Sequence, residues 1–126
     1  MPGKKTLLVV VTDQGAPIVD VFDKKQKTPL YQAARNGKVA TARLLIDHGA
    51  NVHRADNRGW TPLHAASHNG HLGIVKLLLR RNANVDVLNK ANKTADELAS
   101  ENGKAEVAKF IAEYKTDDTL DYIGHS

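Results

Sequence analysis

Three histidines lie close together near the middle of the chain, and imidazole is the side chain best suited to metal binding and proton transfer near neutral pH. His64 and His68 are four residues apart, so on a helix they would share one face, as two zinc ligands do. A hydrolytic zinc helix would carry glutamate directly after the first histidine, but Ala65 stands there, and no carboxylate nearby could serve as third ligand or base. We therefore expect His64 to bond back to a turn and His71 to open a helix, with no metal and no cofactor.

No other catalytic arrangement is present in the sequence. It lacks a serine-centred nucleophile elbow, a glycine-rich phosphate loop and a pair of carboxylates suited to acid–base work. The absence of cysteine excludes disulfides, thiolate metal sites and a cysteine nucleophile, and it fits a reducing compartment. We expect no enzymatic activity and a location in the cytoplasm or nucleus.

Trp60 and Arg58 offer a different chemistry, the recognition of another molecule. Trp60 is the only tryptophan of the chain, and a large rigid ring beside a guanidinium is typical of the residues that dominate protein interfaces. In a second interpretation, Trp60 folds down onto a neighbouring turn and stacks against the stem of Lys27 or Lys93. The two interpretations are compatible, and both depend on the elements that position these side chains.

Those elements repeat along the chain at a spacing of 33 residues. The residues that shape the backbone coincide in three copies, namely Asp23, Asp56 and Asn89; Thr28, Thr61 and Thr94; Ala33, Ala66 and Ala99; Gly37, Gly70 and Gly103; and Leu45, Leu78 and Ile111. A fixed period of this size indicates a solenoid, in which each unit buries its apolar face only against its neighbours.

Each unit is expected to contain a turn followed by two short helices. In the middle copy, residues 56–59 read Asp-Asn-Arg-Gly, a sequence typical of turns. Thr61 can cap the first helix, and Pro62 suits its first position because the missing N–H is not needed there. Gly70 can take the left-handed conformation that ends this helix, and the second helix carries a broad apolar stripe that neighbouring units must cover.

Some departures from the repeat should lower stability. Gln26 and Ala91 replace the turn glycine Gly59, where a positive φ would be strained by a Cβ, so we expect the outer turns to be reshaped. Asn82 takes the place of a helix-ending glycine because asparagine tolerates the left-handed conformation. Asp96 stands where an apolar residue would complete the core, so the sequence does not predict how the first helix of the third repeat packs.

The motif Asp-x-x-Gly-Trp-Thr-Pro-Leu-His-x-Ala at residues 56–66, with Gly-His at residues 70–71, resembles the ankyrin repeat almost position for position. The resemblance implies an all-α ankyrin-repeat solenoid of stacked helix-turn-helix units joined by hairpin loops. The implied repeats are residues 23–55, 56–88 and 89–114, of which the last resembles the polar closing repeat of such arrays.

The two ends lie outside the period. Residues 1–22 are expected to form a capping half-repeat, since residues 10–18 can be laid on the helical residues 44–52. The competing interpretation is a β-strand, because residues 7–11 are rich in β-branched side chains. Residues 115–126 are acidic and lack a period, so we expect them to fray or, alternatively, to lie in the basic groove of the same molecule.

The resemblance also places the binding surface, because in ankyrin proteins the variable turn tips and first helices form a concave face. Carried onto this chain, the expected partner-binding residues are Lys24, Lys25, Lys27, Arg35, Asn57, Arg58, Trp60, His68, Asn69, Lys90 and Lys93. Seven of them are basic, whereas the net charge of the whole chain is only +4. A field of this kind should favour and steer an acidic partner.

The sequence therefore predicts a monomeric, non-catalytic adaptor of one domain that grips an acidic segment of another protein. A sequence pI of about 9.4 also permits nucleic-acid binding, but a single aromatic residue interleaves the basic positions, and no groove-reading helix is implied. A third alternative is a spacer or an excised fragment of a longer array. The sequence has no apolar run of about 18 residues, so no membrane span is expected.

Overall fold

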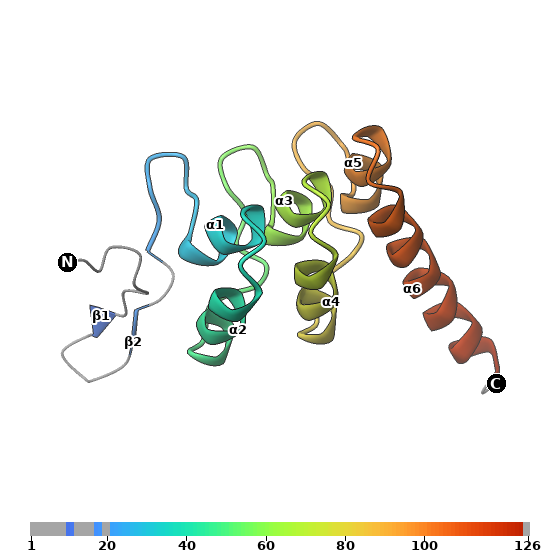
Figure 1. The fold of residues 1–126 in the computed structure, drawn as a ribbon, viewed down its shortest axis with the longest axis horizontal. Coiled ribbons are helices and arrows are strands. Elements are labelled where there is room, and N and C mark those ends of the chain that lie inside the picture. The colour runs from blue at the N-terminus through green and yellow to red at the C-terminus, as the bar shows by residue number, and fades with distance from the viewer. Residues whose placement is uncertain (1–9, 12–16, 19–20, 125–126) are drawn as a thin grey trace.

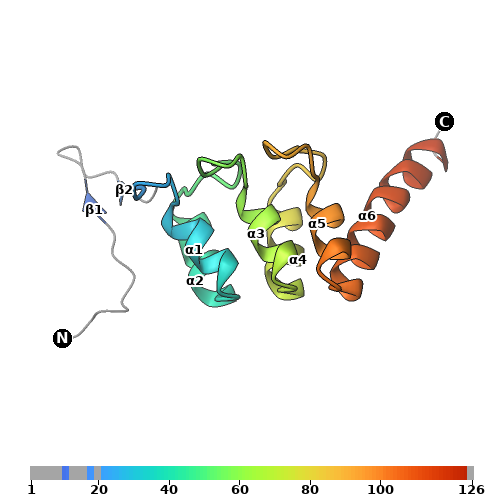
Figure 2. The same ribbon diagram turned by 90° about the horizontal axis from the view of Figure 1, so that it is seen from above.

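The computed structural model describes residues 10–11, 17–18 and 21–124, with side chains described for residues 21–116. Within these ranges, six helices form three antiparallel pairs that stack side by side (Figure 1). The helices are α1 (Pro29–Arg35), α2 (Val39–Asp47), α3 (Pro62–His68), α4 (Leu72–Arg80), α5 (Ala95–Glu101) and α6 (Ala105–Gly124). Long turns lead into α1, α3 and α5, and they project from the same edge (Figure 2). The architecture is the all-α solenoid that the 33-residue period predicts.

The core is a thin apolar layer between the two rows of helices. Leu45, Leu78 and Ile111 hold the same position in the three second helices, and none is more than 1% exposed. The matching position of the first helices is alanine in every copy: Ala33, Ala66 and Ala99. These small side chains are buried and let neighbouring first helices approach closely, which brings the three turns into one row.

Threonine begins each first helix. Thr28 and Thr61 accept a hydrogen bond on Oγ1 from the backbone N–H three residues later, at 3.1 and 3.3 Å, which confirms the predicted cap. At Thr94 the backbone N–H donates to Glu97 Oε1 at 2.8 Å. Pro29 and Pro62 follow directly, so the first two helices begin at the position that their sequence predicts.

The three turns share one backbone conformation. Gln26, Gly59 and Asn92 have φ angles of 67°, 78° and 61°, and each donates its N–H to the carbonyl three residues earlier at 2.9 to 3.0 Å. The prediction for Ala91 is wrong, because the left-handed residue of the third turn is Asn92, which lies 33 residues after Gly59. The outer turns are therefore not reshaped, and the strain of a Cβ at positive φ falls mainly on Gln26. Asn82 has a φ of 72°, as predicted.

The N-terminal segment is extended where the structure describes it. β1 (Val10–Val11) and β2 (Pro17–Ile18) pair antiparallel, with Val10 opposite Ile18. The predicted helical half-repeat is wrong at these four residues, and the strand interpretation, which concerns residues 7–11, is confirmed at Val10 and Val11. β-Branched valine and isoleucine favour extended backbone, and Pro17 lacks the N–H that a helix interior needs. The rest of the predicted half-repeat up to residue 20 lies outside the described residues.

The C-terminal helix is longer than the repeat requires. α6 runs to Gly124, so the predicted fraying from residue 115 is wrong for the backbone up to that point, while residues 125–126 lie outside the described part. Residues 105–123 contain neither glycine nor proline, and nothing in them interrupts a helix. Lys115 also fixes the helix, because its Nζ lies 3.1 Å from Asp96 Oδ1 and 3.6 Å from Asp86 Oδ1.

The contact with Lys115 explains why a polar residue, Asp96, stands where the sequence pattern expects an apolar one. Its carboxylate accepts a hydrogen bond from Thr94 Oγ1 at 2.7 Å as well as from Lys115, so the polar residue joins α5 to α6. Burial acts to raise the pKa of Asp96, but the Thr94 hydroxyl and the Lys115 ammonium outweigh it and hold the pKa below its usual value.

Candidate functional site

An aspartate or asparagine holds each turn in shape. In the middle turn, Asp56 Oδ1 accepts the backbone N–H of Arg58 at 2.8 Å and of Trp60 at 3.0 Å. Asp23 and Asn89 make the same two bonds in the outer turns, at 2.8 to 3.0 Å. Because one side-chain oxygen accepts from two backbone N–H groups in each turn, the three turns keep the same local shape.

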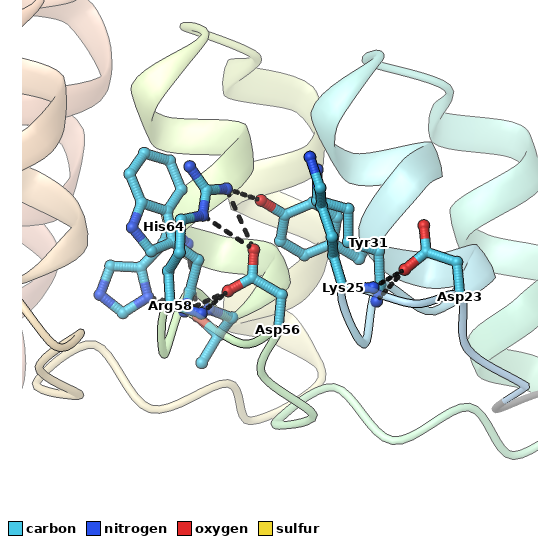
Figure 3. A network of polar contacts seen from close by, with 9 residues as sticks. Asp23, Lys25, Tyr31, Asp56, Arg58 and His64 are labelled. Carbon is cyan, nitrogen blue, oxygen red and sulfur yellow. Dashed lines mark hydrogen bonds and ion pairs between the residues drawn. The ribbon is translucent and has the colours of Figure 1, made fainter.

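Arg58 connects the middle turn to the preceding repeat (Figure 3). Its Nη2 donates to Tyr31 Oη at 2.7 Å and to Asp56 Oδ2 at 3.0 Å, and its Nε lies 3.3 Å from the same Oδ2. The Asp56 side chain is 0% exposed and the Arg58 side chain is 51% exposed. The buried carboxylate therefore fixes a guanidinium whose outer part still faces solvent.

The three groups of this network have defined charges near neutral pH. Burial acts to raise the pKa of Asp56, but backbone N–H groups, the Arg58 guanidinium and the Tyr31 hydroxyl outweigh it and lower that pKa. Burial and the charge of Asp56 raise the pKa of Tyr31 to about 12. The network thus contains an ionised Asp56, a cationic Arg58 and a neutral Tyr31 hydroxyl.

Trp60 is half-buried and packs within its own repeat. The Arg58 guanidinium lies 4.2 Å from the centre of its ring, and the His68 ring lies 5.1 Å away at an interplanar angle of 57°. The predicted stacking on Lys27 or Lys93 is not seen, because Lys27 lies over the Tyr31 ring, with Nζ 5.7 Å from its centre, and Lys93 pairs with Glu101.

A groove of about 400 Å³ lies between the first two turns and along α1 and α3. Its lining residues are Lys27, Tyr31, Arg35, Arg58, Trp60, Ala65, His68 and Asn69. Six of the predicted partner-binding residues meet here, and the eight lining residues include no acidic side chain. Tyr31, which the sequence did not single out, also lines the groove, and its contact with Arg58 brings it there.

The cations of the groove differ in how they are paired. Arg58 forms an ion pair with Asp56, whereas the ion pairs found among residues 21–116 include neither Lys27 nor Arg35. Two positive charges in the groove therefore lack a counter-charge among the side chains that the structure describes. Such charges are available to an external anion at little cost in broken contacts.

Five predicted residues lie outside the groove: Lys24, Lys25, Asn57, Lys90 and Lys93. The first four are exposed at the turn tips, where backbone N–H groups of Asn57 and Lys90 donate to the carbonyls of Lys25 and Arg58 at 2.9 Å. These bonds join consecutive turns. The α6 helix runs away from the turns toward the far end of the molecule (Figure 1), so up to Gly124 the tail does not lie in the groove.

The histidines support the fold. His64 is buried; its Nδ1 accepts the backbone N–H of Thr61 at 3.0 Å, and its Nε2 donates to the Lys93 carbonyl at 3.0 Å. Burial is the main cause that lowers the pKa of His64, so the ring is neutral near pH 7. The predicted bond back to the turn is confirmed, and His71 is the N-cap residue directly before α4, where the sequence predicts a helix to open. Across the described residues, no group of three His, Cys, Asp or Glu side chains could hold a metal ion.

Comparison with known protein families agrees with this geometry. A family model of ankyrin repeats in three copies matches residues 5–91 and residues 53–121. The two matches together span the helix pairs and the turns that form the groove. No curated protein matches the chain. In the part of the chain that the structure describes, no helix is both long enough and apolar enough to cross a membrane.

Proposed function

Because the chain belongs to the ankyrin repeat family, whose members generally bind other proteins, we propose that it is a non-catalytic adaptor that binds an acidic segment of a partner protein. The observation that carries the proposal is the groove, in which the unpaired Lys27 and Arg35 lie beside Arg58 and Trp60. The proposed adaptor acts as a monomer in the cytoplasm or nucleus.

The groove is suited to an acidic segment for electrostatic reasons. Lys27 and Arg35 have no carboxylate of their own within ion-pair distance among the described side chains, so a bound acidic residue gains attraction without breaking an existing pair. A groove that holds cations and no exposed acid also repels basic partners. Charge thus contributes to selectivity as well as to the rate of association.

The groove is also held in shape before a partner arrives. Arg58 is held by Asp56 and Tyr31, and the Trp60 ring contacts both Arg58 and His68. Side chains that are already ordered lose little conformational entropy on binding, so more of the contact energy is retained as affinity. The exposed part of the Trp60 ring adds apolar area to a mainly polar surface.

The proposal can be tested with the only tryptophan as an internal reporter. Titration with a short glutamate-rich peptide should change the fluorescence of Trp60, and the affinity should fall as salt is raised. The double substitution Lys27→Gln with Arg35→Gln should weaken binding by about tenfold or more, since two charge-assisted contacts are lost. Neither side chain belongs to the Arg58 network, so this variant should keep its fold.

A matched control uses Lys24→Gln with Lys90→Gln, which removes the same charge from turn tips outside the groove. This control should retain most of the affinity. Equal losses in the two double variants would mean that total charge, rather than the groove, attracts the peptide. Stronger binding to a random DNA duplex than to the peptide would replace the proposal with nucleic-acid recognition.

A further inference from the structure

We propose that the groove takes a phosphorylated side chain of the partner segment in preference to a carboxylate. The inference rests on the proposed function, because it concerns the chemistry of the same groove. It is carried by the number of cationic residues that line the groove, by the donors that they leave available and by the volume of the groove.

The charge count favours a dianion. Lys27, Arg35 and Arg58 contribute three positive charges to the lining, and the buried Asp56 behind Arg58 contributes one negative charge, so three less one leaves +2. A carboxylate would balance half of this charge. A phosphate monoester carries about −1.5 to −2 near neutral pH and would balance nearly all of it.

The donors of the groove outnumber the oxygens of a carboxylate. Arg58 uses Nε and Nη2 for Asp56 and Tyr31, while its Nη1 makes no hydrogen bond to the described residues. Lys27 and Arg35, each with a cationic group at the end of a long flexible side chain, are lining residues of the same groove. Three separate cationic groups can each donate to one of the three terminal oxygens of a phosphate, whereas a carboxylate has two oxygens.

The space and its walls suit a side chain with a phosphate at its end. A volume of about 400 Å³ is near the lower end of the range for sites that bind small ligands, and it is large enough for one phosphorylated residue. The half-buried Trp60 ring provides apolar surface for the stem of that residue, whereas Tyr31 and Ala65 are almost fully buried beneath the groove. The neutral Tyr31 hydroxyl adds no negative charge that would oppose the phosphate.

The third turn lacks this arrangement. Ala91 stands where the middle turn has Arg58, and Lys93, which aligns with Trp60, is paired with Glu101. Glu101 aligns with Arg35 and His68 at the 33-residue spacing. The first helix of the third repeat, α5, therefore has an acidic residue at the position where α1 has the cation Arg35. The convergence of unpaired cations and aromatic rings is therefore specific to the junction between the first two repeats among the three described turns.

The experiment uses one peptide of alternating glutamate and alanine with its central residue varied among serine, glutamate and phosphoserine. The fluorescence of Trp60 and titration calorimetry report binding to the full chain. We expect the phosphoserine peptide to bind about tenfold more tightly than the glutamate peptide, which corresponds to one additional charge-assisted hydrogen bond. The Lys27→Gln, Arg35→Gln variant should lose this preference, and the Lys24→Gln, Lys90→Gln control should keep it.

Equal affinities for the phosphoserine and glutamate peptides would overturn this inference and leave the acidic-segment proposal standing. Absence of binding to all three peptides would overturn both. Inorganic phosphate provides a further arm: if it displaces the phosphoserine peptide at an equal concentration, the ligand is free phosphate, and the assignment to a peptide is wrong. Persistence of the preference in the Lys27→Gln, Arg35→Gln variant would place the phosphate elsewhere.

Discussion

The first and middle turns have the same backbone hydrogen bonds but differ in what their side chains reach. Asp23 and Asp56 each bond two backbone N–H groups, yet Asp23 is exposed, whereas Asp56 is buried and holds Arg58 with its second oxygen. Arg58 then reaches Tyr31 in the preceding repeat. The difference shows that the repeat supplies the shape of a turn, and that one added ion pair connects the middle turn to the preceding repeat at the groove.

The largest effect that tests this comparison is expected from Asp56→Ala. The substitution removes the Oδ1 atom that accepts two backbone N–H groups and leaves Arg58 without its counter-charge. The free energy of unfolding should fall by about 2 to 3 kcal/mol, the range for breaking a largely buried pair with one exposed partner. Urea denaturation would measure this loss. The same change at the exposed Asp23 should lower stability much less, and equal losses would contradict the comparison.

The backbone of the two turns provides the next test. A Cβ at Gly59, whose φ is 78°, would lie 3.0 Å from the backbone nitrogen of Lys90, so Gly59→Ala should lower stability by about 2 kcal/mol. Gln26 already occupies the left-handed region at a φ of 67°, and Gln26→Gly should raise stability by about 1 kcal/mol. Thermal unfolding of both variants would measure these two changes in stability. A destabilised Gln26→Gly protein would show that the first turn is not strained.

Acid should affect the middle turn through Asp56. Its pKa in the folded protein is below the unfolded value of about 3.9, so its ionised form stabilises the fold above that pH, and the contribution disappears as the pH falls through the folded pKa. Asp56→Asn removes this titration while keeping an acceptor oxygen. The stability difference between wild type and Asp56→Asn should therefore shrink as the pH is lowered from 6 to 3. A difference that stays constant over this range would exclude a lowered pKa.

Most of the fold follows from residues that recur at the 33-residue period. The caps at Thr28 and Thr61 and the left-handed Asn82 are local features, so the sequence alone predicts them. Both ends lie outside the period. There, β-branched side chains decided in favour of strands near residue 10, and an uninterrupted helical sequence extended α6.

The groove was only partly predictable because its partners are distant in sequence. Arg58 and Tyr31 are 27 residues apart, and no local pattern indicates that their side chains meet. Lys93 was predicted as a binding residue from its place in the turn, but its ion pair with Glu101 is a tertiary contact between a turn and a helix end. Choosing which lysines remain unpaired requires the positions of all nearby carboxylates, which the repeat does not encode.

The smallest expected effect comes from giving the third turn the pair that the middle turn has. Asn89 is buried, and its Nδ2 has no hydrogen-bond partner among the described residues. Asn89→Asp alone should be nearly neutral, because stronger bonds to the backbone are offset by a buried charge without a partner. With Ala91→Arg added, we expect a coupling free energy of about 0.5 to 1 kcal/mol from a double-mutant cycle measured by urea denaturation.

The coupling should be smaller than the loss in Asp56→Ala for a structural reason. The residue aligned with Tyr31 is His64, whose Nε2 already donates to Lys93, so a new arginine at residue 91 finds no hydroxyl to reach. Without that second anchor, the carboxylate alone orders the guanidinium, and its outer part stays mobile. A coupling near zero would show that the Tyr31 contact, rather than Asp56, fixes Arg58 in the middle turn. In that case Tyr31→Phe should lower the free energy of unfolding by as much as Asp56→Ala does.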